Sequence, residues 1–289
     1  MKYGNLLPPE GINTTQAHPL KEFVLLTSGL IGIIGIAIII IGLMVEHLAD
    51  QIPFETEVAM SQTMAANMEG GSGEVQSYLQ QLADNLAAAQ NLPDDMSITV
   101  HYVNNPTVNA MASLGGHVVM FQGLLQKLES ENAISMVLAH EIAHVQHRHP
   151  IKSLGRGAMI SLALAAIGIT AGDAGNLLGS AGLLTALSFS RSQEEESDYT
   201  SLRSLFHHYG HVNGGTDLFE VLLKEEAGFM PQVTFLRTHP LSKERIQNIL
   251  DYARQKDWPI KGELTSIPEH LRAEIAASPK PETASNAPS

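Results

Sequence analysis

His140-Glu141-Ile142-Ala143-His144 has the form His-Glu-x-x-His and is the most informative stretch of this 289-residue chain. Apolar residues recur three and four positions apart around it, which predicts a helix over Asn132 to Gln146. On such a helix the two histidines project from one face, where their imidazoles can bind one zinc ion. Glu141 is one residue off that line and can act as a general base on a water molecule. The stretch predicts a catalytic zinc site of the metalloprotease type.

A catalytic zinc site needs a third protein ligand. A third ligand also strengthens the prediction, since a chance match to this pattern in a chain of this composition has odds of roughly a few per cent. A carboxylate cluster downstream contains Glu194 and Asp198, which share a helix face at a spacing of four residues. Glu194 can complete the ligand set, and Asp198 can accept a hydrogen bond from a ligand imidazole. The alternative is the solvated acidic start of a helix, which acidic residues favour through the helix dipole. We assign Glu195 and Glu196 to that alternative.

Three motifs follow one another along the chain. They are the stretch at 140–144, the segment Ser190-Arg191-Ser192-Gln193-Glu194-Glu195-Glu196-Ser197-Asp198, and Thr238-His239-Pro240. This set resembles the family-48 (M48) zinc metallopeptidases, which include HtpX-like proteases and CAAX prenyl endopeptidases. The resemblance covers residues 50–252 and implies an α+β fold: a mainly helical zincin-type (gluzincin) domain with a small sheet.

The resemblance also implies the roles of the residues that bind metal and carry the chemistry. One zinc ion per chain is expected on His140, His144 and Glu194, with Glu141 as the base. A set of two histidines and one glutamate is well matched to zinc.

Further residues around the expected metal have supporting or open roles. Asp198 matches the acid that orients a ligand, and Arg191 matches the arginine of the motif. His239 matches a histidine that either stabilises the oxyanion of the tetrahedral intermediate or occupies the open metal position in a resting form. His147 and His149 continue the helix, and we expect surface or supporting roles for them rather than a second metal site.

The segment from Val108 to Leu125 resembles the family's Asn-Ala segment, Gly-Gly turn, strand and Gly-Leu-Leu helix start. Proteases of this type hold substrate as an added strand, which requires an exposed sheet edge and tolerates many side chains. We expect the substrate-binding strand to be Gly116-His117-Val118-Val119-Met120-Phe121. The expected partners are protein or peptide substrates in an extended conformation.

An apolar run near the N-terminus predicts a transmembrane helix. Phe23 to Val45 contains no charged residue, and its 23 residues can cross a hydrocarbon core of about 30 Å. The competing interpretation is a cleaved signal peptide, but the run is too long and has no small-residue cleavage site. Lysines precede the run and acidic residues follow it, so the N-terminus is expected in the cytoplasm. The catalytic domain is then expected on the periplasmic or extracytoplasmic side of an inner membrane, anchored by a single pass.

A second apolar region lies between Leu154 and Phe189. Two more membrane spans are one interpretation, but Ala158 to Ala171 is short and a Gly/Asp/Asn-rich break at 172–176 follows it. We expect a pair of buried or interfacial helices, which could line the cleft or contact lipid. Shorter periodic segments predict a helix over Glu74 to Gln90 and a strand over Ser97 to Val103. Further helices are expected over 217–224 and 241–254.

Composition excludes several classes of function. The chain has no cysteine, so disulfides, thiolate ligands and cysteine nucleophiles are ruled out. A net charge of -13 argues against a nucleic-acid partner, because no basic surface exists to neutralise phosphates.

The expected organisation is a cytoplasmic segment (1–22), a signal anchor (23–45), a zinc metallopeptidase domain (46–255) and a C-terminal extension (256–289) whose Pro/Ser/Ala-rich end is disordered. The function we infer is a zinc metalloendopeptidase that hydrolyses misfolded or membrane-proximal envelope proteins in protein quality control. The rival is a chaperone-like or binding protein with a structural or latent zinc site, in which Glu141 would have no required role.

Overall fold

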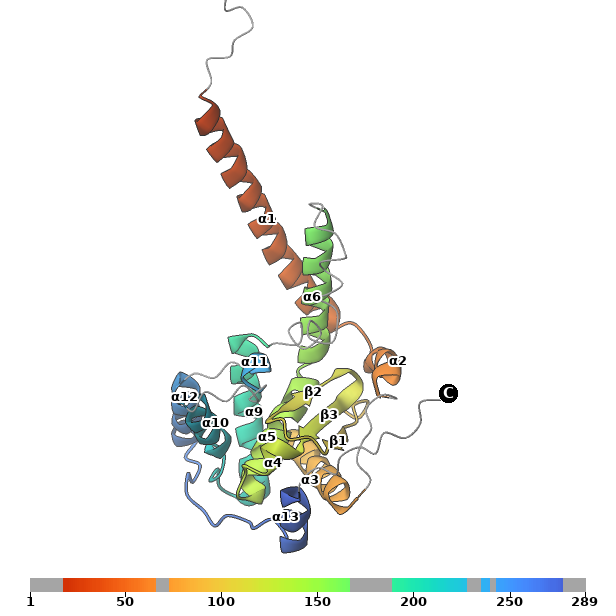
Figure 1. Ribbon diagram of the computed structural model, residues 1–289, viewed down its shortest axis with the longest axis vertical. Coiled ribbons are helices and arrows are strands. Elements are labelled where there is room, and N and C mark those ends of the chain that lie inside the picture. Colours follow the sequence, from red (N-terminus) through yellow and green to blue (C-terminus); the bar gives the residue numbers. More distant parts are fainter. Residues whose placement is uncertain (1–17, 66–72, 167–188, 228–234, 240–242, 278–289) are drawn as a thin grey trace, which may run out of the picture. The chain divides into compact units, whose positions relative to one another are not determined.

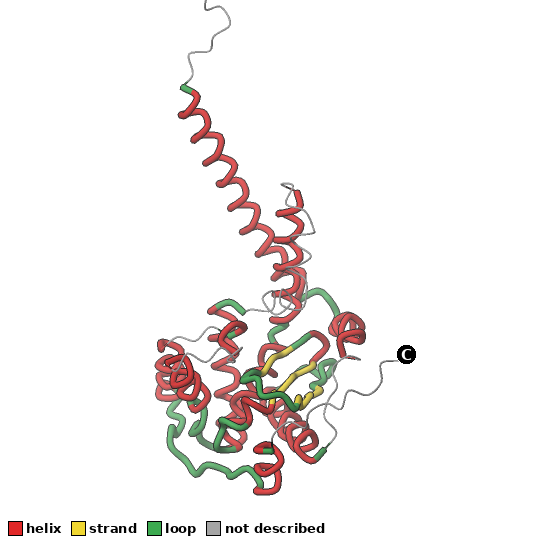
Figure 2. The backbone as a smooth tube through the Cα atoms, viewed as in Figure 1, coloured by secondary structure: helices red, strands yellow, loops and turns green. Residues whose placement is uncertain are grey.

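The computed structural model describes residues 18–65, 73–166, 189–227, 235–239 and 243–277. It divides into two units, residues 1–44 and 45–289. The described elements, labelled in Figure 1, are α1 (Pro19–Ala49), α2 (Phe54–Ala65), α3 (Glu74–Gln90), β1 (Thr99–Val103), β2 (Ala110–Ala112), the 3-10 turn η1 (Leu114–Gly116), β3 (His117–Phe121), α4 (Gln122–Leu125), α5 (Glu131–Gln146), α6 (His149–Ala166), α9 (Arg191–Tyr209), α10 (Asp217–Ala227), α11 (Phe235–Thr238), α12 (Lys243–Gln255) and α13 (Glu269–Ala276). Helix dominates, and strands are few (Figure 2).

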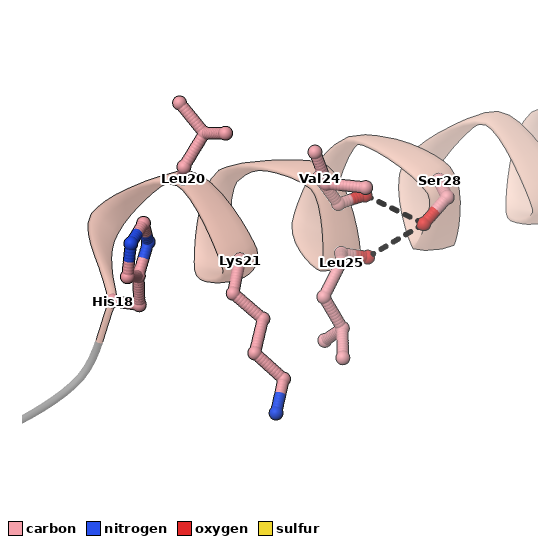
Figure 3. A pocket seen from close by; sticks show the side chains of 6 residues that line it. All are labelled: His18, Leu20, Lys21, Val24, Leu25 and Ser28. Carbon is pink, nitrogen blue, oxygen red and sulfur yellow. Dashed lines mark hydrogen bonds between the residues drawn. The ribbon is translucent and has the colours of Figure 1, made fainter.

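Helix α1 contains the apolar run of the first unit. Among the described residues it is the one helix long and apolar enough to cross a membrane. Most of its large apolar side chains are exposed. The hydroxyl of Ser28 donates to the carbonyl oxygens of Val24 (2.6 Å) and Leu25 (3.2 Å), which satisfies its polar group within the apolar helix (Figure 3).

The second unit contains a three-stranded mixed sheet with the order β1-β3-β2. Strand β3 pairs in parallel with β1, placing His117 opposite Thr99, and antiparallel with β2, placing Val118 opposite Ala112. Gly116 enters β3 with φ of 79°, and any Cβ there would collide with the carbonyl oxygen of Ser97. The predicted Gly-Gly turn is therefore a close backbone approach that only glycine permits.

The core forms where α3 and α5 pack against one face of the sheet and α9 packs against both helices. Ser130 caps α5 by accepting a hydrogen bond from the backbone nitrogen of Ala133. Helix α9 starts with a capping box, in which Ser190 and Gln193 each bind the other's backbone N–H. These caps fix where the two motif-bearing helices begin, and therefore which residues of each helix face one another.

The helices expected at 74–90 and 132–146 are confirmed by α3 and α5, and the strand expected at 97–103 is confirmed by β1. Packing continues past residue 255, because Leu271 and Ile275 of α13 are buried in the main core. The second apolar region begins as helix α6, and the remainder of the expected hairpin, 167–188, lies outside the described residues. The expected disordered end, 278–289, also lies outside them.

Candidate active site

Helices α5 and α9 lie side by side and supply the three expected metal ligands (Figure 1). His140 is 4% exposed, and His144 and Glu194 are fully buried. The Nε2 atoms of the two histidines are 3.0 Å apart, and Oε1 of Glu194 is 3.5 Å from Nε2 of His144. The structure thus brings together donor atoms from positions that are fifty residues apart in the chain.

His239, the residue that follows α11, joins the same cluster. Its Nδ1 lies 3.0 Å from Oε1 of Glu194 and 3.4 Å from Nε2 of His140. One donor atom from each of His140, His144, Glu194 and His239 lies within 4.8 Å of the others. In a tetrahedral zinc site with bonds near 2.05 Å, donor atoms are about 3.3 Å apart. The four donors fit such a metal, with His239 at the fourth position.

Each histidine ligand on α5 has a hydrogen-bond partner on its other ring nitrogen. Nδ1 of His140 lies 3.1 Å from Oδ1 of Asp198. Arg245 of α12 holds this carboxylate with two hydrogen bonds of 2.8 Å, from Nε and Nη2, and its Nη1 lies 2.7 Å from Oε2 of Glu194. One guanidinium therefore orients both a ligand and the partner of a ligand, in the fork geometry that arginine favours.

Arg245 was missed by the sequence reasoning, although α12 carries a signal for it. Arg245, Ile249 and Ala253 recur at intervals of four residues and are all buried, so the arginine lies on the apolar face of an amphipathic helix. A charge at such a position requires a buried partner. The motif arginine Arg191, by contrast, is exposed at the first residue of α9, and the structure does not bring it to the cluster.

Two phenylalanines that the sequence reasoning also missed pack on the histidine rings. Phe189 stacks on His144 with ring centroids 3.8 Å apart, and Phe235 stacks on His239 at 4.3 Å. The backbone nitrogen of Phe189 donates to the carbonyl oxygen of Thr238, which ties the start of α9 to α11. The rings exclude solvent and restrict the orientation of the imidazoles.

Burial and neighbouring charges determine the protonation of the cluster. Burial alone lowers the pKa of His140, but hydrogen bonds to Asp198 and Glu194 raise it to about 10. Burial and the charge of His140 lower the pKa of His144 well below its usual value. Burial opposes ionisation of Glu194, yet the charge of His239 and the hydrogen bond from His140 hold its pKa well below the ordinary range. The cluster strongly favours an ionised Glu194, the form that binds a cation.

Glu141 lies beside the cluster without belonging to it. Both of its carboxylate oxygens are buried and lack a hydrogen bond of normal geometry, and Oε1 lies 3.4 Å from Nε2 of His239. Burial raises the pKa of Glu141, and the charges of His239 and His140 oppose this rise. A buried carboxylate with free acceptor oxygens next to a set of metal donors can take a proton from water.

The structure corrects the expected substrate strand. Gly116 precedes β3 and the residues 117–121 form it, but β3 is the central strand and is paired on both sides. An added strand requires a free edge, so β3 cannot accept one.

The outer edge of β1 is covered by side chains of α3. Gln76 donates to the carbonyl oxygen of Val100 and accepts from the nitrogen of Tyr102. Gln80 donates to the carbonyl oxygen of Ile98 and accepts from the nitrogen of Val100. The backbone groups of this edge are therefore already paired.

Strand β2 provides the other edge. Asn109 and Ser113 bond to β3, so alternation directs the backbone groups of Ala110 and Ala112 away from β3. The backbone of Ala112 lies against the Glu141 carboxyl and favours its charged form. At the other end of this edge, the nitrogen of Phe235 donates to the carbonyl oxygen of Val108 over 3.3 Å. The edge of β2 thus runs from α11 to Glu141.

Comparison with known proteins agrees with this arrangement. The sequence profile of peptidase family M48 matches residues 74–253, which include the four-donor cluster, Glu141, Asp198 and Arg245. The chain is 31% identical over 179 residues to the mitochondrial metalloendopeptidase OMA1 of Schizosaccharomyces pombe, covering 61% of this chain and 52% of the relative. It is 30% identical over 189 residues to a putative beta-barrel assembly-enhancing protease of Vibrio cholerae, covering 62% and 39%.

A beta-barrel assembly-enhancing protease of Escherichia coli is 29% identical over 166 residues, covering 53% of this chain and 34% of the relative. The chain therefore spans about half or less of the length of these relatives. The profile match covers more than half of the chain, and the matched segment holds every donor of the cluster. The chain belongs to peptidase family M48.

Proposed function

We propose that this protein is a zinc-dependent endopeptidase that cleaves extended segments of misfolded or membrane-proximal envelope proteins. The observation that carries the proposal is the buried cluster of His140, His144, Glu194 and His239 with the buried Glu141 carboxylate beside it. In a purely structural metal site, a fully buried carboxylate that does not bind the metal would be costly and would serve no purpose.

The residues divide the chemistry of peptide hydrolysis among them. His140, His144 and Glu194 would hold zinc, which when bound lowers the pKa of a water molecule and polarises the scissile carbonyl. Glu141 takes a proton from the attacking water and passes it to the leaving amine. Asp198 and Arg245 keep His140 and Glu194 in place, so that the donors do not have to reorganise during the reaction.

The edge of β2 that faces away from β3 is the proposed substrate-binding edge. An extended peptide paired with Ala110 and Ala112 would run toward Glu141, which places its main chain next to the base. Main-chain pairing tolerates many side chains but requires an accessible, extended segment. Misfolded and unassembled proteins supply such segments, and relatives named for beta-barrel assembly support a role in the envelope.

Helix α1 would anchor the protein in an inner membrane by a single pass. Lys21 is at its N-terminal end, whereas Asp50, Glu55 and Glu57 follow it, which supports a cytoplasmic N-terminus and an extracytoplasmic catalytic domain. This placement brings the peptidase close to proteins in and near the membrane.

The Glu141→Gln variant tests the proposal. Purified wild type and variant, both loaded with zinc, are incubated with casein, and the metal content of each is measured. We expect both to bind zinc and the variant to lose about 10²- to 10⁴-fold in cleavage rate, the typical contribution of a general base. Chelator-sensitive cleavage by the wild type alone supports the peptidase. Zinc binding with undiminished cleavage by the variant would remove Glu141 from the chemistry.

The rival is a chaperone-like or binding protein with a structural zinc site. It predicts that both proteins bind zinc, that neither cleaves casein even after His239→Ala, and that both suppress the aggregation of an unfolded protein equally.

A further inference from the structure

His149 is a buried histidine that lies directly behind a proposed metal ligand. It is 1% exposed and follows Arg148, whose φ of 60° ends α5 and reverses the chain. This reversal brings Nδ1 of His149 to 2.9 Å from Nδ1 of His144. Two imidazoles five residues apart in the chain are thereby in hydrogen-bond contact.

The direction of this hydrogen bond follows from the geometry of His144. Its Nε2 faces the other donors, at 3.0 Å from Nε2 of His140, so its ring proton is on Nδ1. That proton is donated to Nδ1 of His149, which must then be an acceptor. A neutral His149 carries its own proton on Nε2.

Glu196 accepts that second proton. Its Oε2 lies 3.3 Å from Nε2 of His149, and its Oε1 lies 3.3 Å from Nδ1 of His147. The Glu196 side chain is 53% exposed, so the hydrogen-bonded chain runs from the buried cluster to the surface of α9. Glu196 is thus more than the solvated helix-start residue expected from sequence.

A histidine buried only for packing would need one partner to satisfy its donor. In His149, Nδ1 instead accepts from His144 and Nε2 donates to Glu196. The two rings also meet edge-on, with centroids 5.0 Å apart. The ligand on the other side of the cluster, His140, meets the carboxylate of Asp198 directly. The two ligand histidines therefore differ in their support: one has an anionic partner, the other a neutral partner backed by a carboxylate.

We propose that His149 and Glu196 are positioning residues for the metal centre: they form a relay His144–His149–Glu196 that fixes the tautomer and orientation of His144. The inference rests on the proposed metal site but not on cleavage. Loss of such a supporting partner typically weakens metal affinity by about 10- to 100-fold.

The test measures the zinc dissociation constant of the full-length protein by competition with a chromogenic chelator. His149→Leu removes the hydrogen bonds to His144 and Glu196, together with the weaker 3.4 Å contact to the Ser197 hydroxyl, and should weaken zinc binding by about 10- to 100-fold. His149→Asn keeps an acceptor near the position of Nδ1 and should recover most of the affinity. The absorption spectrum of the Co²⁺-loaded protein should change in His149→Leu and return toward wild type in His149→Asn, which a role in packing alone would not produce.

A matched pair on α9 tests the outer end of the relay without altering the core. Glu196→Ala should weaken zinc binding, whereas Glu195→Ala, which removes the neighbouring exposed carboxylate bonded to Tyr199, should not. This pair remains informative if His149→Leu does not fold.

Two results would overturn the relay: wild-type affinity in folded His149→Leu, or equal affinities of Glu196→Ala and Glu195→Ala. If the wild type itself binds no zinc, the proposed metal site fails and the relay fails with it. If the wild type binds zinc and cleaves while all these variants equal it, only the relay fails.

Discussion

His239 is the residue whose two expected roles differ in the direction of their effect. Its Nδ1 lies among the donor atoms, at 3.0 Å from Glu194 and 3.4 Å from His140, and the ring is fully buried under Phe235. A catalytic zinc site needs an open position for water. A histidine that fills that position competes with water and lowers the rate, and we propose this role for His239 over oxyanion stabilisation.

We therefore expect His239→Ala to raise the rate of casein cleavage. The fourth position becomes free for water, and the other three donors remain. The measurement compares initial rates of the zinc-loaded variant and wild type, with His239→Ala/Glu141→Gln as the control that must be inactive. A fall of about 10²- to 10³-fold instead would assign His239 to the oxyanion role.

Arg245 is the residue whose loss should cost the most stability at the site. Arg245→Met removes the guanidinium that pairs with the buried carboxylates of Asp198 and Glu194, and removing one partner of a buried pair typically costs about 3–5 kcal/mol. Arg254→Met on the same helix is the matched control, because that arginine is 55% exposed and pairs with the equally exposed Asp251. We expect a change within about 0.5 kcal/mol for the control. Urea unfolding of both variants measures the difference, and equal values would show that the buried network contributes little.

At the level of elements, the two edges of the sheet differ in what their backbone groups are paired with. The edge of β1 is paired with glutamine side chains from α3, whereas the edge of β2 runs between α11 and Glu141. An exposed edge is a template for pairing with any extended chain. The paired edge of β1 leaves the edge of β2, on the side where the base lies, as our proposed place for strand addition.

The glutamines of α3 should contribute measurably to stability. Gln76→Ala and Gln80→Ala each leave two backbone groups of the β1 edge without their partner, which costs about 1–3 kcal/mol for each buried unsatisfied group. Gln81→Ala on the exposed face of α3 is the matched control and should be nearly neutral. Chemical denaturation followed by circular dichroism measures all three. If the three variants unfold at the same denaturant concentration, water replaces the glutamines without cost.

At the level of the whole molecule, metal binding should couple to folding. The donors come from α5, α9 and the residue after α11 and converge only in the folded chain, so a ligand that binds them stabilises the native state. Zinc at 100 times its dissociation constant should add about 2.7 kcal/mol. For a domain of this size, that corresponds to a rise in Tm of about 5–11 °C. Thermal unfolding with zinc and with chelator measures the shift, which His144→Ala should abolish; an unchanged shift in that variant would place the bound metal elsewhere.

The membrane topology is testable because the chain has no native cysteine. Single cysteines at Lys21 and Lys261, both exposed, mark the two sides of α1. A membrane-impermeant maleimide applied to intact spheroplasts should label Lys261→Cys and not Lys21→Cys, and detergent should allow both to react. The opposite pattern would place the catalytic domain in the cytoplasm.

Local sequence was sufficient for the elements whose signals lie within one or two helical turns. The helix around His140 and His144, the Glu194/Asp198 face and the apolar run of α1 are each encoded by residues that are neighbours in the chain. The residue types and spacing of these motifs also carried the metal-site interpretation, because donor chemistry is fixed by the side chain.

The remaining features depend on pairings between distant segments, which periodicity does not encode. The position of β3 in the middle of the sheet is set by the order in which the strands pair. The proposed substrate-binding edge is therefore that of β2 and not of β3. Arg245, 47 residues beyond Asp198, and His149, 47 residues before Glu196, acquire their roles only when α12 and the end of α5 pack against α9. Local sequence determines which groups can bind a metal or accept a proton, whereas tertiary packing determines which of them meet, because buried polar groups must find partners wherever the fold places them.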